Sequence, residues 1–189
     1  MALRNAILAA LTDNESSGYD LAKAFNVAVS HFWTATPQQL YRELEKMEAA
    51  GLVQARVVEQ ERRPNKRLFS LTDAGRRALH DFTTGTPKPM AIRDELLVQI
   101  TAMELADIPS LRIAVQARLE AAERKLKQYE RSREYLLDGR NEADYLAQQP
   151  SQLGRYLTLV RGIAFEQENF RWCGLVLRTL AQDSPADPR

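Results

Sequence analysis

Several residue types are scarce in this sequence, and each scarcity removes a class of protein. One of the 189 residues is cysteine and two are histidine. The chain therefore cannot form an intramolecular disulfide, and it offers no pair of histidines at metal-binding spacing. It also lacks a Gly-rich phosphate loop and a Ser, His and Asp set in a catalytic order. We expect no enzyme activity, no metal and no cofactor.

Long apolar runs are also missing. No stretch approaches the roughly 18 apolar residues of a transmembrane helix, and the opening Met-Ala-Leu-Arg does not resemble a signal peptide. These features predict a cytoplasmic protein without a membrane partner. The single cysteine, Cys173, falls in a helical pattern, where a buried structural thiol is the expected role and redox sensing is the alternative.

The overall charge is small. The net charge is +1, and 44% of the residues are hydrophobic. This hydrophobic content is ample for a folded core, and the length allows one large domain or two small ones. Because the total charge is close to zero, a role in nucleic-acid binding must rest on local charge.

Residues 36–51 have the pattern of a helix with defined ends. Thr36 is a good N-cap, Pro37 suits the first helical position, and Gly51 suits the left-handed turn that closes a helix. Apolar residues at spacings of four and three predict one buried stripe: Leu40, Leu44 and Met47. The polar side chains on the first turns then face outward: Gln38, Gln39, Tyr41 and Arg42.

A β-hairpin is predicted directly after this helix. Residues 52–58 are rich in β-branched side chains, residues 67–71 give the return strand, and Pro64-Asn65 is turn chemistry. The turn region carries four basic residues: Arg62, Arg63, Lys66 and Arg67. The expected product is a hairpin with a basic tip.

A helix with amides and a guanidinium near its N-terminus, followed by a basic hairpin, is what a winged helix-turn-helix requires. Such side chains read base edges in the major groove, while a basic loop neutralises nearby phosphates. DNA binding is therefore the leading interpretation. The competing interpretation is that both features are only solvated, solubilising surface.

The flanking segments predict the rest of a first domain. Two helices are expected before the segment, with apolar stripes at Leu3, Ile7, Leu8 and Leu11 and at Leu21, Ala24 and Phe25. Ser16 or Ser17 can cap the second of them. His31, Phe32 and Trp33 are expected to pack beneath the recognition helix. A further helix, capped by Thr72, is expected to pack on the base of the hairpin through Ala74, Ala78, Leu79 and Phe82.

Three stretches carry a resemblance to a known family. They run from Ser17 to Lys23 (SGYDLAK), from Leu40 to Val53 (LYRELEKMEAAGLV) and from Lys66 to Gly75 (KRLFSLTDAG). Their order and spacing resemble the PadR family of bacterial transcriptional regulators throughout residues 1–82. Arg42 stands where the family usually has proline, and Leu68-Phe69 replaces a common Tyr-Tyr pair.

The resemblance implies operator DNA as the partner and repression as the sign of regulation. It also implies DNA contacts from Tyr41 and from the basic cluster of Arg62, Arg63, Lys66 and Arg67.

The second half of the chain is predicted to be helical. Residues 83–90 have the Gly, Pro and Thr content of a linker, residues 91–182 form a second domain, and residues 183–189 form a flexible tail. One helix is expected through Ile92, Leu96, Leu97, Ile100 and Met103. A longer helix follows, with an average apolar spacing of 3.5 residues, as in coiled coils. Its repeat comprises Ile108, Leu111, Val115, Leu119, Ala122, Leu126, Tyr129, Arg133 and Leu136, and Asp138-Gly139 ends it.

The last predicted helix, from about Ser151 to Leu180, is apolar nearly all round. A helix that is apolar on more than one face needs more than one partner, so we expect a homodimer through this domain. A compact monomeric subdomain is the alternative. An apolar or aromatic effector, of the kind that the resemblance implies, is expected to bind among five aromatic residues that equally suit an ordinary core: Tyr129, Tyr156, Phe165, Phe170 and Trp172.

The predicted fold is therefore mostly α with a small β-hairpin wing, in which an N-terminal winged helix-turn-helix precedes a coiled-coil-like dimerisation domain. The predicted function is that of a DNA-binding transcriptional regulator, a repressor released by its effector. The alternative is a dimeric helical protein whose winged helix binds a protein partner in place of DNA.

Overall fold

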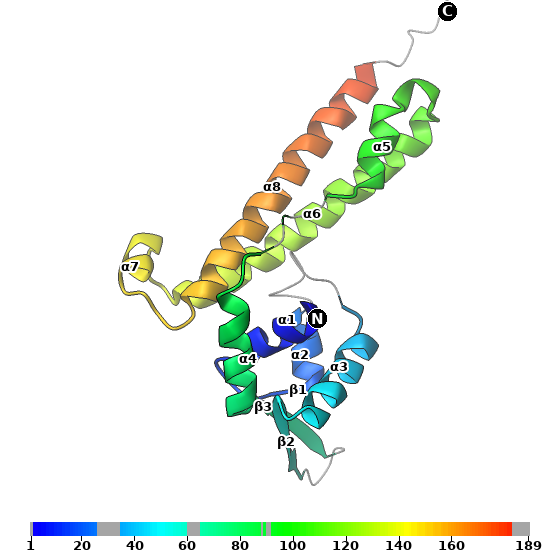
Figure 1. Cartoon of the computed structure of the whole chain (residues 1–189). Coiled ribbons are helices and arrows are strands. Elements are labelled where there is room, and N and C mark those ends of the chain that lie inside the picture. The colour runs from blue at the N-terminus through cyan, green and yellow to red at the C-terminus, as the bar shows by residue number, and fades with distance from the viewer. Residues whose placement is uncertain (1, 26–34, 60–64, 88, 90–91, 183–189) are drawn as a thin grey trace, which may run out of the picture. The chain divides into compact units, whose positions relative to one another are not determined.

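The computed structural model describes residues 2–25, 35–59, 65–87, 89 and 92–182. The chain divides into two compact units, Met1–Lys88 with Gln149–Arg155, and Pro89–Gln148 with Tyr156–Arg189. The fold is mostly helical with one small antiparallel sheet, as the sequence predicts (Figure 1). The predicted positions of His31, Phe32 and Trp33 and of the tail at 183–189 lie outside the described residues.

The first unit is a winged helix-turn-helix. Its elements follow in the order α1 (Ala2–Ala10), β1 (Ser16–Ser17), α2 (Gly18–Ala24), α3 (Pro37–Ala49), β2 (Val53–Val58), β3 (Lys66–Leu71) and α4 (Asp73–Thr83). The helix ends follow the predicted chemistry. The Ser17 hydroxyl accepts a hydrogen bond from the amide of Asp20, and the Thr72 hydroxyl accepts one from Gly75. After α3, Gly51 takes a φ of +67°, the left-handed conformation that glycine adopts without strain.

The sheet has three strands in the order β1-β3-β2, all antiparallel. Strands β2 and β3 pair from Val53 with Leu71 to Val58 with Lys66. The sequence predicts this hairpin but not β1, because two serines have no strand pattern of their own. They become a strand only because residues 68 and 69 lie beside them. This pairing ties the start of α2 to the wing.

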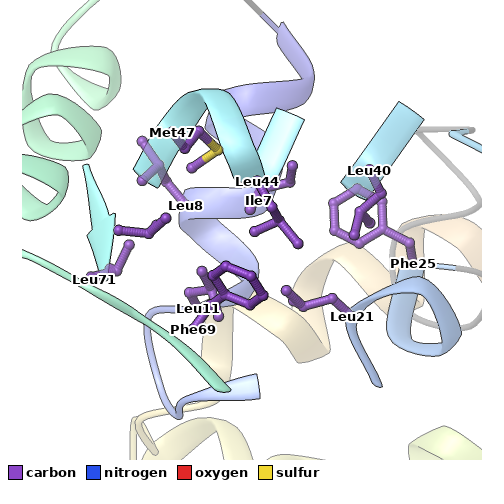
Figure 2. Close-up of a cluster of buried hydrophobic side chains, with 11 residues drawn as sticks. Ile7, Leu8, Leu11, Leu21, Phe25, Leu40, Leu44, Met47, Phe69 and Leu71 are labelled. Atoms are coloured by element: carbon purple, nitrogen blue, oxygen red, sulfur yellow. The ribbon is translucent and has the colours of Figure 1, made fainter. Parts of the chain in front are cut away.

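The core of this unit lies between the helices and one face of the sheet (Figure 2). Helices α1, α2 and α3 each contribute the predicted stripe. The buried residues are Ile7, Leu8, Leu11, Leu21, Phe25, Leu40, Leu44, Met47, Val53, Phe69 and Leu71. Burial of a large apolar side chain contributes about 1.5–3 kcal/mol, so this core fixes α3 with its polar face outward. One prediction is wrong: Phe82 is 56% exposed, because α4 contacts this core through Ala78 and Leu79, one turn earlier.

The second unit contains α5 (Glu95–Thr101), the 3-10 turn η2 (Met103–Leu105), α6 (Ile108–Leu137), α7 (Glu142–Ala147) and all of α8 (Leu153–Gln182) from Tyr156 onward. The two 30-residue helices, α6 and α8, lie side by side and antiparallel (Figure 1). Cross-helix bonds show the direction. Arg112 donates to the carbonyl of Leu180, Lys125 pairs with Glu166, and Arg133 donates to Tyr156. All nine positions of the predicted 3.5-residue repeat are buried or half-buried.

Two apolar clusters hold this helix pair. Leu96 of α5 packs with Leu111, Val115, Cys173 and Leu180, while Tyr129 packs with Leu159 and Ile163. Cys173 is fully buried, and burial raises the pKa of its thiol. This agrees with a structural role, since a thiol held protonated is a poor nucleophile.

Three details differ from the sequence prediction. The first helix of this unit begins at Glu95, where Asp94 accepts a hydrogen bond from the amide of Leu96. Ile92 and Leu97 are therefore not on a buried stripe, being 72% and 42% exposed. The short helix α7 was not predicted, because one buried residue, Tyr145, gives no periodic pattern. None of the helices in the described part of the chain has the length and apolar character needed to cross a membrane.

Candidate nucleic-acid interface

The N-terminus of α3 is held by a capping box. The Thr36 hydroxyl accepts a hydrogen bond from the backbone amide of Gln39 at 3.2 Å. In return, the Gln39 side-chain oxygen accepts one from the backbone amide of Thr36 at 3.0 Å. The reciprocal pair satisfies two backbone donors that a helix end otherwise leaves unpaired. Gln39 thus acts in the cap, which the sequence analysis did not foresee. Its side-chain amide group is a donor that the cap does not use.

The outer face of α3 presents the other predicted residues. Gln38, Tyr41 and Arg42 are exposed, while Leu40 on the opposite face is buried. The Tyr41 ring, 44% exposed, lies against Gly18 at the start of α2. A Cβ at Gly18 would overlap this ring, with 2.9 Å to Cδ1 and 3.1 Å to Cζ. Glycine at this position therefore sets where the Tyr41 ring lies.

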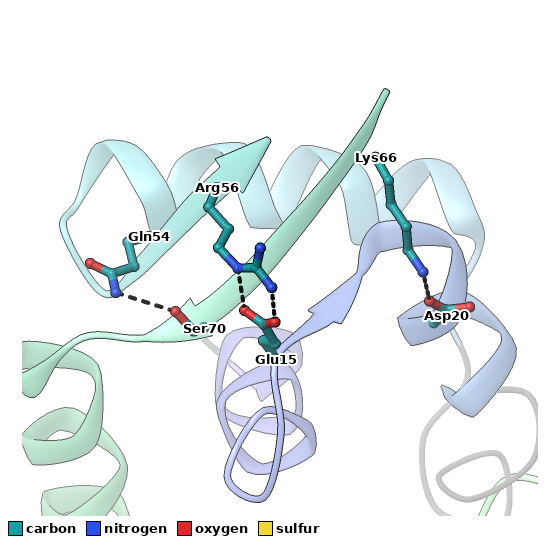
Figure 3. A network of polar contacts seen from close by, with 6 residues as sticks. All are labelled: Glu15, Asp20, Gln54, Arg56, Lys66 and Ser70. Atoms are coloured by element: carbon teal, nitrogen blue, oxygen red, sulfur yellow. Dashed lines mark hydrogen bonds and ion pairs between the residues drawn. The ribbon is translucent and has the colours of Figure 1, made fainter. Parts of the chain in front are cut away.

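The wing begins beside these helices. Of the four basic residues predicted at its tip, Arg62 and Arg63 lie outside the described residues. Lys66 pairs with Asp20 of α2 at 2.8 Å, and Arg67 pairs with Glu48 of α3 at 2.6 Å (Figure 3 shows the Lys66 pair). The guanidinium of Arg67 also lies 5.2 Å from the centre of the Phe69 ring.

Further polar contacts connect the strands to the segment before α2. Arg56 of β2 forms a two-bond ion pair with Glu15, and the Gln54 amide donates to the Ser70 hydroxyl at 3.3 Å (Figure 3). None of these acidic partners was predicted from the sequence. Nothing in the local pattern marks them, because Glu15 and Arg56 are 41 residues apart.

A hollow of about 500 Å³ lies between α2, α3 and β3. Its lining includes Gly18, Tyr19, Asp20, Tyr41 and Lys66. The Lys66 ammonium and the Ser17 hydroxyl hold the pKa of Asp20 below its ordinary value. The hollow thus combines aromatic rings with the ion pair between Asp20 and Lys66.

The five aromatic residues predicted for an effector site are dispersed over the second unit. Tyr129 lies in the cluster with Leu159 and Ile163, whereas Trp172 packs against the cluster around Cys173. Tyr156 is buried, with its ring centre 4.9 Å from that of Tyr145. Phe165 and Phe170 are 43% and 41% exposed. Tyr129 and Trp172 therefore belong to different apolar clusters.

Metal binding receives no support from the described ranges of the chain, which contain no group of three or more His, Cys, Asp or Glu residues able to hold an ion.

Comparison with known proteins identifies the family. The model of the PadR-like family of transcriptional regulators matches residues 7–81, and the model described as virulence activator alpha C-term matches residues 92–181. A probable transcriptional regulator of Mycobacterium tuberculosis is 32% identical over 96% of this chain and 99% of its own length. The chain belongs to the PadR family of transcriptional regulators. PadR proteins are regulators rather than enzymes, so this chain is not an enzyme.

Two further proteins match nearly the whole chain. The negative transcriptional regulator PadR of Bacillus subtilis is 27% identical over 96% of this chain and 98% of its own length. Its structure with operator DNA has 26% identity and a TM-score of 0.73, covering 95% of this chain and 99% of that one. Its structure with p-coumaric acid has 25% identity and a TM-score of 0.67, with 96% and 99% covered. The Vibrio cholerae virulence activator AphA has 26% identity and a TM-score of 0.68, with 95% and 98% covered.

Proposed function

We propose that this PadR-family regulator binds operator DNA as a homodimer and represses transcription until a small aromatic molecule releases it. The observation that carries the proposal is the outward face of α3. Gln38, Tyr41 and Arg42 are exposed there, on a helix whose buried stripe fixes its orientation beside a basic wing. The solved complex of B. subtilis PadR with operator DNA supports the same partner for this chain.

Each element has a distinct part in the proposed complex. The first turns of α3 enter the major groove, where Gln38, Gln39 and Arg42 reach base edges and Tyr41 contacts phosphate. The wing residues Arg62, Arg63, Lys66 and Arg67 contact the backbone and supply affinity without reading sequence. A basic wing that served solubility alone would add no salt dependence to DNA binding.

The dimer is supported by apolar side chains of α8 that the described part of the chain leaves exposed. On α8, Leu157 and Leu175 are 53% and 55% exposed. They lie 18 residues apart, about five helical turns, so both occupy one face of the helix. Ala164 lies on the same face and is also exposed. A second subunit would cover this face and place the two α3 helices to meet successive major grooves, about 34–36 Å apart.

Repression and the effector rest on the B. subtilis relative, which is a negative regulator solved with p-coumaric acid. For this chain we propose an apolar or aromatic ligand that binds the DNA-free form of the dimer more tightly than the DNA-competent form. Tyr129 and Tyr156, on the facing helices α6 and α8, are the two fully buried rings of the predicted set. The relatives are bacterial, and their operators lie in the cytoplasm, which we propose as the location of this protein.

The test starts from the full-length protein and DNA. Purified protein selects fragments from a random pool, and the enriched duplex is placed beside a promoter driving a reporter. We expect enrichment of a motif with two related halves, lower reporter output with the protein, and recovery on addition of p-coumaric acid or a related aromatic acid. Saturated analogues of the same acids serve as controls. Failure to enrich any motif would contradict sequence-specific DNA recognition. A rise in reporter output would contradict repression and indicate an activator.

A further inference from the structure

The described cations at the base of the wing are already paired within the chain. Lys66 Nζ lies 2.8 Å from Asp20 Oδ2, and Arg67 Nη2 lies 2.6 and 2.8 Å from the two carboxylate oxygens of Glu48. The four side chains are between 34% and 49% exposed. Solvent, and therefore a ligand, can reach both pairs.

The two acids belong to the helices of the helix-turn-helix, Asp20 to α2 and Glu48 to α3. Asp20, Lys66 and Arg67 line the same hollow as Tyr41 of α3. Asp20 is itself fixed in place, because the Ser17 hydroxyl donates to Asp20 Oδ2 at 2.7 Å and accepts from the Asp20 amide at 3.1 Å. The carboxylate therefore stays at the rim of the hollow that Tyr19 and Tyr41 line.

A cation that is already paired with a carboxylate contributes less to the free energy of DNA binding than a free cation does. A free lysine that meets a phosphate releases a condensed counterion, and this release drives binding at low salt. A lysine taken from a carboxylate leaves that carboxylate to collect a cation from solution. The gain from counterion release is then largely cancelled.

We propose that Asp20 and Glu48 compete with DNA phosphates for Lys66 and Arg67 and so determine the affinity of this interface for the DNA backbone. The inference rests on the proposed function, in which the wing contacts phosphates. The acids lower the affinity for any duplex, sequence-specific or not, and keep a chain with a basic wing from being held on DNA by charge alone.

The experiment measures binding of the full-length protein to a fluorescent mixed-sequence duplex over a series of salt concentrations. Asp20→Asn keeps an acceptor for the Ser17 hydroxyl while removing the charge. We expect it to tighten binding about twofold to fivefold per subunit, the range that an exposed ion pair supplies. The plot of log affinity against log salt should steepen by about 0.9 per subunit. Glu48→Gln should act likewise through Arg67.

Two controls separate this effect from a change in net charge. Asp81→Asn, at an exposed position of α4 in the same unit, removes one negative charge away from the wing. It should raise DNA affinity by less and leave the slope of log affinity against log salt unchanged. In a Lys66→Gln background, Asp20→Asn should give no gain in DNA affinity, because the partner of Asp20 is gone.

Equal effects of Asp20→Asn and Asp81→Asn on DNA affinity would overturn the proposal. If Lys66→Gln weakens binding but Asp20→Asn changes nothing, the competition is absent while the wing still binds DNA. If neither changes binding, the wing contact itself is wrong.

Discussion

The ring of Tyr41 lies against the backbone of Gly18, so the recognition helix and the first helix of the motif meet where one residue has no side chain. A Cβ at position 18 would lie 2.9 Å from Tyr41 Cδ1, closer than van der Waals contact permits. The ring is the end of a flexible side chain, so it would move while the backbone stayed in place. Gly18 therefore decides where the proposed phosphate contact of Tyr41 is presented.

Gly18→Ala should weaken DNA binding to about the level of Tyr41→Ala. Overpacking costs about 1–3 kcal/mol of folding free energy where the neighbour cannot move. The cost should be smaller here, because the Tyr41 ring can move. In a Tyr41→Ala background the space is free, so Gly18→Ala should be neutral or stabilising, by up to about 1 kcal/mol. Thermal melts and anisotropy titrations measure both quantities. Gly154→Ala, where an added Cβ meets nothing within 4 Å, is the control, and an additive pair of effects would refute the coupling.

The capping role of Gln39 can be separated from base reading. Gln39→Glu keeps an acceptor for the Thr36 amide, since glutamate serves equally in a capping box, but replaces the amide donor by a charge. We expect unchanged thermal stability with altered sequence preference in binding selections. Gln39→Ala should change the sequence preference and also lower the stability of the protein. The expected loss is about 0.5–2 kcal/mol, the usual cost of removing an N-cap. A wild-type motif recovered with Gln39→Glu would restrict this residue to the cap.

Arg42 tests base reading without involvement in the cap. Arg42→Ala should relax the selected motif by about 1–3 kcal/mol at the base that it contacts, the range for a good bidentate pair. Lys46→Ala, another exposed cation on the same helix but about two and a half turns from its start, serves as the matched control. It should leave the motif intact. Equal loss of affinity on every sequence for Arg42→Ala would reassign this residue to the phosphate backbone.

Dimerisation is tested on the outward face of α8. Leu175→Asp places a charge on exposed apolar surface, so it should leave the fold of the subunit intact and shift a dimer toward monomer. Light scattering coupled to gel filtration measures the mass. Gln167→Asp introduces the same charge on the same helix without removing an apolar side chain. Leu126 would be a poor choice, because it packs against Tyr129, Leu159 and Ile163 within the chain. A wild-type monomer at micromolar concentration would contradict the proposal directly.

An ion pair with a buried carboxylate joins α6 and α8, and loss of its cation should lower the free energy of unfolding. Glu166 is 2% exposed and accepts hydrogen bonds from Lys125 at 2.6 Å and Asn169 at 3.1 Å. Lys125→Met leaves this carboxylate buried without its cation, which should destabilise the protein by about 1–3 kcal/mol. Lys127→Met breaks the exposed pair with Glu123 and should cost less than about 1 kcal/mol. Urea titrations followed by circular dichroism compare the two, and equal costs would show that the burial of Glu166 has no energetic effect.

The sequence by itself determined the elements and which faces are buried. Periodicity places Leu40, Leu44 and Met47 in the core because burial of a helical stripe depends on spacing along one element. Thr36, Gly51 and Thr72 mark ends of elements because capping is decided within a few residues. The amphipathic face of α3 and the length of α6 follow from the same local rules.

Only the tertiary structure decided how those elements meet. Ser16 and Ser17 become a strand, and Lys66 and Arg67 become paired, because residues distant in sequence arrive beside them. Tyr129 and Trp172 pack in different clusters for a related reason: residues along α6 and α8 meet different neighbours, and the helix period alone does not say which. The contact between Gly18 and Tyr41 is of this kind as well. Spacing fixes what an element is, whereas the positions of its neighbours fix what each side chain touches.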